Sequence, residues 1–173
     1  MKVTVLGAGN MGAAFVKQLS RAGHQVTVTA RNLDKALAVA QANPGAVAVA
    51  PAGAAASADA IVLATGYGDA VSALQSLGDL RGKVVVDITN PLTADYMCLT
   101  LGHSTSAAEE IAKAAPGAEV VKAFNPVFAQ VLTDADGIDA GQAEWAASVS
   151  GGHVGRARRL ATDPDARDRR TQA

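Results

Sequence analysis

Short apolar runs alternate with amphipathic segments along the first 123 residues of the chain. Six runs have the branched, apolar composition of β-strands, and they lie at residues 2–6, 25–29, 47–50, 60–64, 84–88 and 119–123. Four segments between them have the spacing of helices, at residues 10–22, 32–42, 69–77 and 105–114. This alternation predicts an α/β chain with a Rossmann-type doubly wound parallel sheet.

Two details of the pattern support this fold class. The runs 60–64 and 84–88 are apolar at nearly every position, which is typical of strands covered by helices on both faces. Ser106 and Glu109 have the spacing of a capping box at the start of the last predicted helix. A helix boundary at this place fits a strand–helix–strand order.

The pattern changes after about residue 133. Residues 143–149 fit one more strand or a helical turn, and residues 151–173 contain six arginines, three aspartates and one leucine. We therefore predict a domain at residues 1–135 and an atypical, partly disordered, solvated tail at 136–173. A basic tail could instead bind RNA or a phosphate surface, but the interspersed aspartates argue against that alternative.

Composition narrows the classes of function. The 173 residues carry a net charge of −1, which offers no electrostatic case for binding nucleic acid or an acidic membrane. Because no apolar stretch reaches 18 residues, we expect no membrane span and a cytoplasmic protein. The single cysteine, Cys98, excludes an intrachain disulfide and a cysteine-based zinc site, and we expect an inert, half-buried thiol. No spacing of histidines and carboxylates indicates a metal site.

The first candidate site is a glycine loop. Gly7, Gly9 and Gly12 match the pattern G-x-G-x-x-G, with Asn10 and Met11 between the last two glycines. The pattern is weak alone, but here it follows a predicted strand and opens a predicted helix, which is the context of a dinucleotide site. Free amides at the helix start would then bind the pyrophosphate. The alternative is a glycine-rich turn without a ligand.

The end of the second predicted strand indicates which dinucleotide binds. An NAD site usually has an acidic residue there, to hold the ribose hydroxyls. This chain has Arg31 instead, with Lys35 one helical turn later. Both cations could bind a 2′-phosphate, so NADP(H) is favoured over NAD(H). The alternative is that Arg31 and Lys35 are two solvated surface charges.

The carboxyl ends of the later strands supply candidates for the reaction centre. Thr65, Asn90 and Asn125 follow three of these strands and are expected to frame the nicotinamide, although Asn residues also form ordinary turns. Substrate-side candidates are Pro91, His103 and Phe124, and the loop 95–104 could close over a substrate. A histidine bonded to loop backbone is the alternative interpretation of His103.

The chain lacks the acid–base sets of alcohol dehydrogenases. Neither Tyr67 nor Tyr96 has a lysine four residues later. Oxidation of an alcohol needs a group that accepts the hydroxyl proton, whereas hydride transfer between a nicotinamide and a flavin-like ring mainly needs stacking and exclusion of water. The sequence favours the second chemistry.

Residues 1 to about 132 resemble the NADPH-dependent coenzyme F-420 reductase family, whose core is shared by ferric reductase domains of the STEAP type. The resemblance rests on the glycine loop, Arg31, and the segments 84–92, 102–110 and 121–125. It implies hydride transfer between NADPH and a deazaflavin (coenzyme F-420) or flavin above the strand ends. The family usually has serine, proline, and threonine or asparagine where this chain has Ala30, Gly66 and Pro126.

Members of that family also continue with a further strand–helix–strand passage, which the arginine-rich tail replaces here. A second hypothesis is therefore a non-catalytic NADP-binding module, either a truncated remnant or a redox-sensing partner. A third is a hydroxy-acid dehydrogenase of the 6-phosphogluconate type, although 173 residues leave no room for its helical second domain unless a partner chain supplies it. An incomplete sheet edge would favour pairing, so a homodimer is one expected state.

Overall fold

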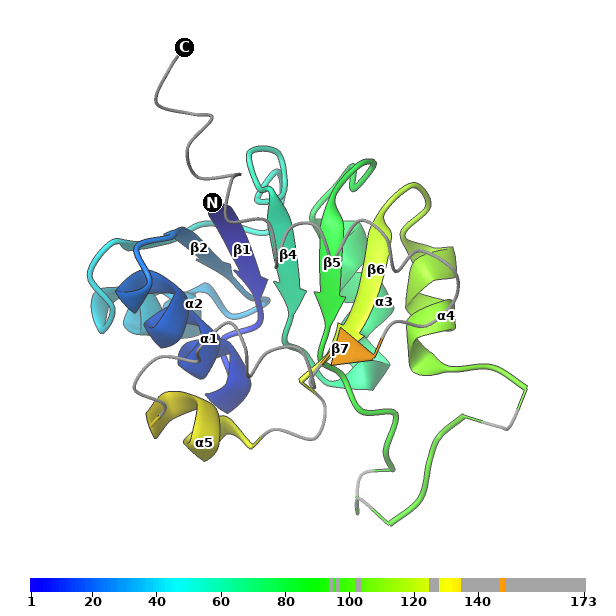
Figure 1. Ribbon diagram of the computed structural model, residues 1–173. Coiled ribbons are helices and arrows are strands. Elements are labelled where there is room, and N and C mark those ends of the chain that lie inside the picture. Colours follow the sequence, from blue (N-terminus) through cyan, green and yellow to red (C-terminus); the bar gives the residue numbers. More distant parts are fainter. Residues whose placement is uncertain (94, 96, 102–103, 125–127, 135–146, 149–173) are drawn as a thin grey trace.

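A computed structural model describes residues 1–93, 95, 97–101, 104–124, 128–134 and 147–148. Its strands are β1 (Lys2–Leu6), β2 (Gln25–Thr29), β3 (Ala46–Ala48), β4 (Ala60–Leu63), β5 (Val84–Asp87), β6 (Glu119–Ala123) and β7 (Ala147–Ser148). They form one sheet in the order β3-β2-β1-β4-β5-β6-β7 (Figure 1). The first six strands are parallel, and β7 pairs antiparallel with β6. The parallel order 3-2-1-4-5-6 is that of a doubly wound sheet, so the predicted fold class is confirmed.

Five described helices connect and cover the sheet. They are α1 (Asn10–Arg21), α2 (Leu33–Gln41), α3 (Tyr67–Ser76), α4 (Ala107–Ala114) and α5 (Ala129–Asp134). One buried cluster joins β1 and β2 to α1, α2 and α5, and a second joins β4 and β5 to α3 and α4. The helices therefore form a layer on each face of the sheet, as Figure 1 shows.

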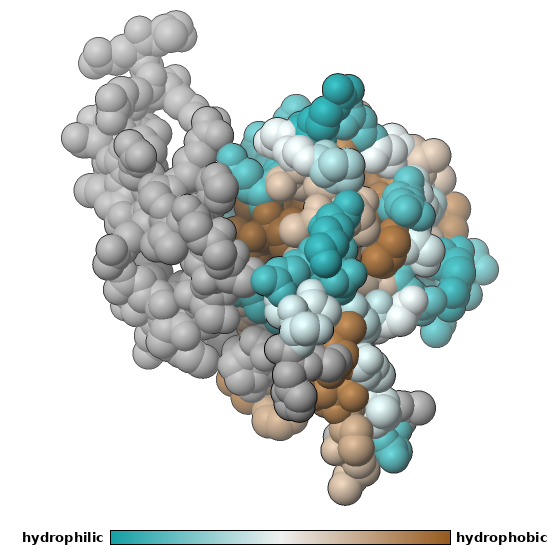
Figure 2. All heavy atoms as spheres, turned by 90° about the vertical axis from the view of Figure 1, so that its right-hand side faces the viewer, coloured by the Kyte–Doolittle hydropathy of each residue, from teal (hydrophilic) through white to brown (hydrophobic). Residues whose placement is uncertain are grey.

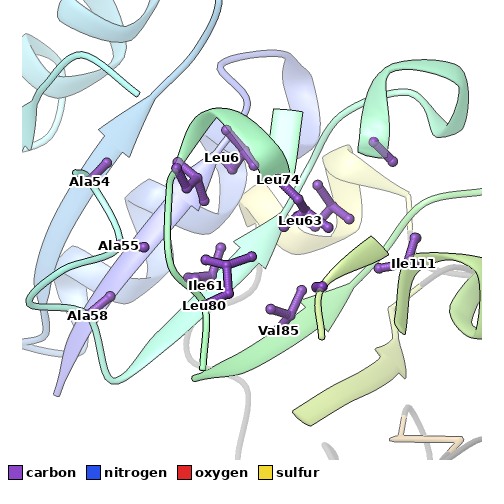
Figure 3. Packing of buried hydrophobic residues seen from close by; sticks show 13 residues of the cluster. Leu6, Ala54, Ala55, Ala58, Ile61, Leu63, Leu74, Leu80, Val85 and Ile111 are labelled. Carbon is purple, nitrogen blue, oxygen red and sulfur yellow. The ribbon is translucent and has the colours of Figure 1, made fainter. Parts of the chain in front are cut away.

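Strand β4 illustrates why the core needs apolar residues without alternation. Ile61 and Leu63 belong to the cluster beneath α3 and α4 (Figure 3). Val62 belongs to the other cluster, beneath α1. All three side chains are buried, at 0%, 0% and 5% exposure. Burying each aliphatic side chain of this size stabilises the fold by about 1.5–3 kcal/mol. The expectation that this strand is covered on both faces is confirmed.

The boundaries of several elements differ from those predicted. Strand 47–50 is shorter and lies at Ala46–Ala48, and helix 69–77 begins earlier, at Tyr67. Helix 32–42 begins at Leu33 because the Asn32 side chain accepts a hydrogen bond from the Lys35 amide and so caps it.

Helix α4 begins at Ala107, one residue after its N-cap. The predicted capping box is confirmed, with Ser106 as N-cap and Glu109 bonding back to the Ser106 amide. The expectation for Cys98 was wrong, because this residue is exposed on the segment between β5 and α4.

Helix α5 was not predicted. It packs on α1, where Lys17 Nζ donates to the Thr133 carbonyl at 2.9 Å and Gln18 Nε2 donates to the Leu132 carbonyl at 2.7 Å. These two side chains satisfy carbonyl groups at the end of α5, which a six-residue helix cannot satisfy by itself. A boundary at residue 135 stays a prediction, because most of 136–173 lies outside the described residues. Within the described part of the chain, no helix has the length and apolar character needed to cross a membrane.

Candidate dinucleotide site

The carboxyl ends of the parallel strands meet at one edge of the sheet. The chain runs from β1 outward to β3, and it then returns past β1 to form β4 on the other side. The direction of winding therefore reverses between β1 and β4, and ligands of open α/β sheets bind outside the strand ends at such a point. The loop that follows β1 is the glycine loop, so it lies at this reversal.

Backbone packing requires two of the three glycines. Gly7 has a φ of 125°, and a Cβ added there would lie 2.2 Å from the Ala64 carbonyl oxygen. A Cβ on Gly12 would lie 2.0 Å from the carbonyl oxygen of Gly7. The amide of Gly7 also donates to the Thr29 carbonyl at 2.8 Å, which ties the loop to the end of β2. The loop therefore turns tightly at Gly7, and α1 packs closely against it at Gly12.

Gly9 differs from its two neighbours in the motif. A Cβ added at Gly9 would have no heavy atom of the described residues within 4 Å, its chain neighbours aside. Gly9 is the N-cap of α1 and provides no side-chain cap, and the first turn contains no acidic residue. The first amides of this helix, from Asn10 and Met11, have no intrahelical acceptors by geometry. Open space before uncapped helical amides fits the pyrophosphate of a dinucleotide.

Arg31 and Lys35 lie at the same edge, just beyond β2. The Arg31 side chain is 89% exposed, and among the described residues it pairs with Asp69 of α3, with Nη1 and Oδ1 3.4 Å apart. Lys35 is exposed in the first turn of α2. The structure thus places two cations beside the glycine loop, with the guanidinium largely in solvent.

The described residues expected at the reaction centre and on its substrate side follow β4, β5 and β6. Thr65 and Pro91 are half-buried and Asn90 is exposed, whereas Asn125 and His103 lie outside the described residues. The hydroxyl groups of Thr65 and Thr89 are buried, and neither has a hydrogen-bond partner among the described residues. Their roles stay predictions.

Phe124 has an unusual backbone conformation. Its φ of 58° makes it the one non-glycine residue with a positive φ in the part of the chain that the structure describes. Its ring packs edge-on against Phe15 of α1, with centroids 5.1 Å apart and an interplanar angle of 88°. Strained backbone of this kind concentrates at functional sites, and Phe124 ends β6 at the site edge.

A buried ion pair that was not predicted from the sequence lies beneath this edge. Asp87 and Lys122 are register partners on β5 and β6, and Lys122 Nζ lies 3.1 Å from Asp87 Oδ2. Their side chains are 0% and 14% exposed. Lys122 also donates to the Thr89 carbonyl, and the Thr89 amide donates to Asp87 Oδ1 at 2.8 Å. The pair therefore fixes both backbone groups of Thr89, directly before Asn90.

Sequence signals for this pair existed, because each charge interrupts an apolar strand.

Tyr67, at the start of α3, is a further polar group near the Asp87–Lys122 pair. Burial, and then the negative charges of Glu110 and Asp87, raise the pKa of the Tyr67 phenol. The phenol is therefore neutral at physiological pH and is not a proton acceptor. No cluster of three or more metal-ligating side chains occurs among the described residues.

Comparison with known proteins identifies the family. Residues 2–91 match the family model described as NADP oxidoreductase, coenzyme F-420-dependent. The chain belongs to this family. It is also similar to a crystal structure of a putative F-420-dependent NADP reductase from Arthrobacter sp. FB24, with 32% identity and a TM-score of 0.69 over 78% of this chain and 67% of that one.

Two further relatives extend the comparison. Metalloreductase STEAP3 of Rattus norvegicus is 32% identical over 132 residues, which are 76% of this chain. The chain spans about a quarter (26%) of the length of that relative. A reductive aminase from Aspergillus terreus, solved with NADPH and ethyl levulinate, is 26% identical with a TM-score of 0.57, over 75% of this chain and 43% of the aminase. The family is thus one of NADP-dependent oxidoreductases, as the resemblance implied.

Proposed function

We propose that this member of the F-420-dependent family binds NADP(H) at the glycine loop and transfers hydride between its nicotinamide and a deazaflavin or flavin-type acceptor. The observation that carries the proposal is the pairing of an open, uncapped helix start at Gly9 with the exposed guanidinium of Arg31 at the end of β2. NADP(H) across the β1–β4 reversal needs both features, one for the pyrophosphate and the other for the 2′-phosphate.

The two ends of the cofactor would contact different elements. Amides of Asn10, Met11 and Gly12 would hold the pyrophosphate, with Gly7 shaping the turn beneath them. Arg31 and Lys35 would bind the 2′-phosphate, Arg31 through its planar fork and Lys35 as a point charge.

The nicotinamide would lie over the ends of β4 and β5. We assign Thr65, Asn90 and Asn125 to its frame, and Pro91, His103 and Phe124 to the acceptor side. The Tyr67 phenol near this edge does not suit proton abstraction from an alcohol, since burial raises its pKa. The bound cofactor supplies the hydride, and the chain's own task is to orient the two rings and exclude water.

The segment after Pro91 supports an apolar acceptor. Met97 and Leu99 are 79% and 63% exposed on the projection between β5 and α4. Figure 2 shows apolar surface continuing onto the projecting segment at the bottom of that view. Apolar side chains beside the proposed nicotinamide site fit the face of a flat ring system.

Calorimetric titration with NADPH and NADH tests the cofactor assignment. We expect tighter binding of NADPH, and we expect Arg31→Ala to remove most of that preference because it deletes the main 2′-phosphate ligand. Arg81→Ala is a matched control, since Arg81 is 79% exposed and pairs with Asp79, but it lies at the amino edge before β5. Equal losses of NADPH and NADH affinity in Arg31→Ala would contradict the assignment.

A turnover assay with NADPH and either coenzyme F-420 or FMN tests the reaction. Oxidation of NADPH that depends on one of these acceptors would support hydride transfer. Tight NADPH binding without turnover on any acceptor would favour the second hypothesis, a non-catalytic NADP-binding module.

A further inference from the structure

The Arg31–Asp69 ion pair joins the two flanks of the glycine loop. Arg31 follows β2 and Asp69 lies in the first turn of α3, which follows β4. Strand β1 lies between β2 and β4 in the sheet, and the glycine loop continues from its end. A contact of 3.4 Å between these side chains therefore spans the edge at the place proposed for the dinucleotide.

The Arg31–Asp69 ion pair is weak and can break at little cost in free energy. The two side chains are 89% and 58% exposed, and the pair has a single nitrogen–oxygen contact, longer than a normal charge-assisted hydrogen bond. Exposed pairs of this kind contribute little to stability. A phosphate dianion offers the guanidinium more charge and a bidentate geometry, so it displaces Asp69 as the partner of Arg31.

When a phosphate displaces Asp69 from Arg31, the Asp69 carboxylate stays near the site. Asp69 is anchored on a helix, whose Ser72 hydroxyl donates to the Asp69 carbonyl at 2.9 Å. Its charge therefore remains close to any phosphate that Arg31 holds, and the two negative groups repel each other. An NAD-type ribose carries no phosphate at this position, so it experiences neither the competition for Arg31 nor the repulsion.

We infer that Asp69 is a specificity-determining residue that weakens NADP(H) binding through Arg31 and thereby limits the preference over NAD(H). This inference rests on the proposed function, because it needs the 2′-phosphate at Arg31. The consequence is faster release of a phosphorylated cofactor than the cations alone would allow. Release of this kind suits a cofactor that exchanges at every turnover.

A double-mutant cycle tests the inference with the full chain, using calorimetry with NADPH and NADH at low salt. Asp69→Asn should tighten NADPH binding about two- to fivefold, the range expected for one exposed ion pair, and leave NADH binding within about twofold. In the Arg31→Ala background the gain should fall by at least half. At high salt the gain should fade, because exposed charges are screened.

Asp79→Asn is the matched control, since it breaks an exposed Arg–Asp pair at the opposite edge of the sheet. It should change neither affinity. Weaker NADPH binding in Asp69→Asn, or equal changes for NADPH and NADH, would overturn the inference. If wild type shows no preference for NADPH, or Arg31→Ala loses both cofactors equally, the proposed function fails as well. If Arg31→Ala behaves as proposed and Asp69→Asn does not tighten NADPH, only the inference fails.

Discussion

Because the Asp87–Lys122 ion pair is buried, replacing one of its two residues should lower the free energy of unfolding by an unusually large amount for a single polar side chain. Replacing Lys122 by methionine keeps the length of the side chain but removes the charge that faces Asp87. Asp87 is 0% exposed, so solvent cannot replace the lost partner. The Thr89 carbonyl loses its donor in the same variant. Both effects act in the folded state alone.

The magnitude follows from this burial. Breaking a buried ion pair from one side typically destabilises a protein by about 3–5 kcal/mol. Small proteins have total unfolding free energies of about 5–15 kcal/mol, so Lys122→Met should lose a large fraction of the stability. The loss can be measured by urea unfolding, followed by far-UV circular dichroism, as a shift of the midpoint at unchanged slope.

Two further variants make the reasoning testable. Lys113→Met breaks an exposed bridge to Glu110, at 70% and 35% exposure, and should change stability by less than about 0.5 kcal/mol. Asp87→Asn combined with Lys122→Met removes both charges and should recover more than half of the loss. If Lys122→Met destabilises no more than Lys113→Met, or if the double variant is the least stable of all, the pair does not stabilise the strand ends as argued.

Three other substitutions check separate parts of the structure. Gly9→Ala meets no atom within 4 Å and keeps an allowed backbone, with φ −83°, so unfolding by urea should be unchanged while calorimetry shows weaker NADPH binding. Gly12→Ala places a Cβ 2.0 Å from the Gly7 carbonyl and should lower the thermal midpoint by several degrees. Glu109→Ala should destabilise α4 at neutral pH, because a backbone hydrogen bond from Ser106 holds the pKa of Glu109 below its ordinary value of 4.5. A lowered folded-state pKa stabilises only while the carboxyl is ionised, so thermal unfolding of Glu109→Ala and wild type should converge as pH falls below 4.5.

The fold was predictable because its signals are local. Buried parallel strands have apolar residues at nearly every position, and helix starts often have caps, as Asn32 and Ser106 provide. The glycine loop was predictable for the same reason, since the φ of Gly7 and the packing of Gly12 arise within one strand–turn–helix unit.

Features that depend on residues far apart along the chain could not be predicted from the sequence. Helix α5 has six residues, and its carbonyl groups are held by Lys17 and Gln18, whose partners lie 116 and 114 residues away. The pairing of Asp87 with Lys122 needs the register of β5 and β6, and that of Arg31 with Asp69 needs the strand order. Neither of these two ion pairs was predicted from the sequence.

Several exceptions to ordinary folding rules lie at the carboxyl edge of this sheet. A buried ion pair, buried threonine hydroxyls without described partners, and a phenylalanine in left-handed backbone all lie at the ends of β4, β5 and β6. If stability alone determined these residues, we would expect apolar side chains in place of the ion pair and the threonines, and a glycine in place of the phenylalanine. The amino edge, by contrast, has exposed turns and the solvent-facing Arg81–Asp79 pair. Because strain and buried polarity persist where function requires them, their concentration at the carboxyl edge supports a reaction centre there, beyond the dinucleotide loop that the sequence already indicates.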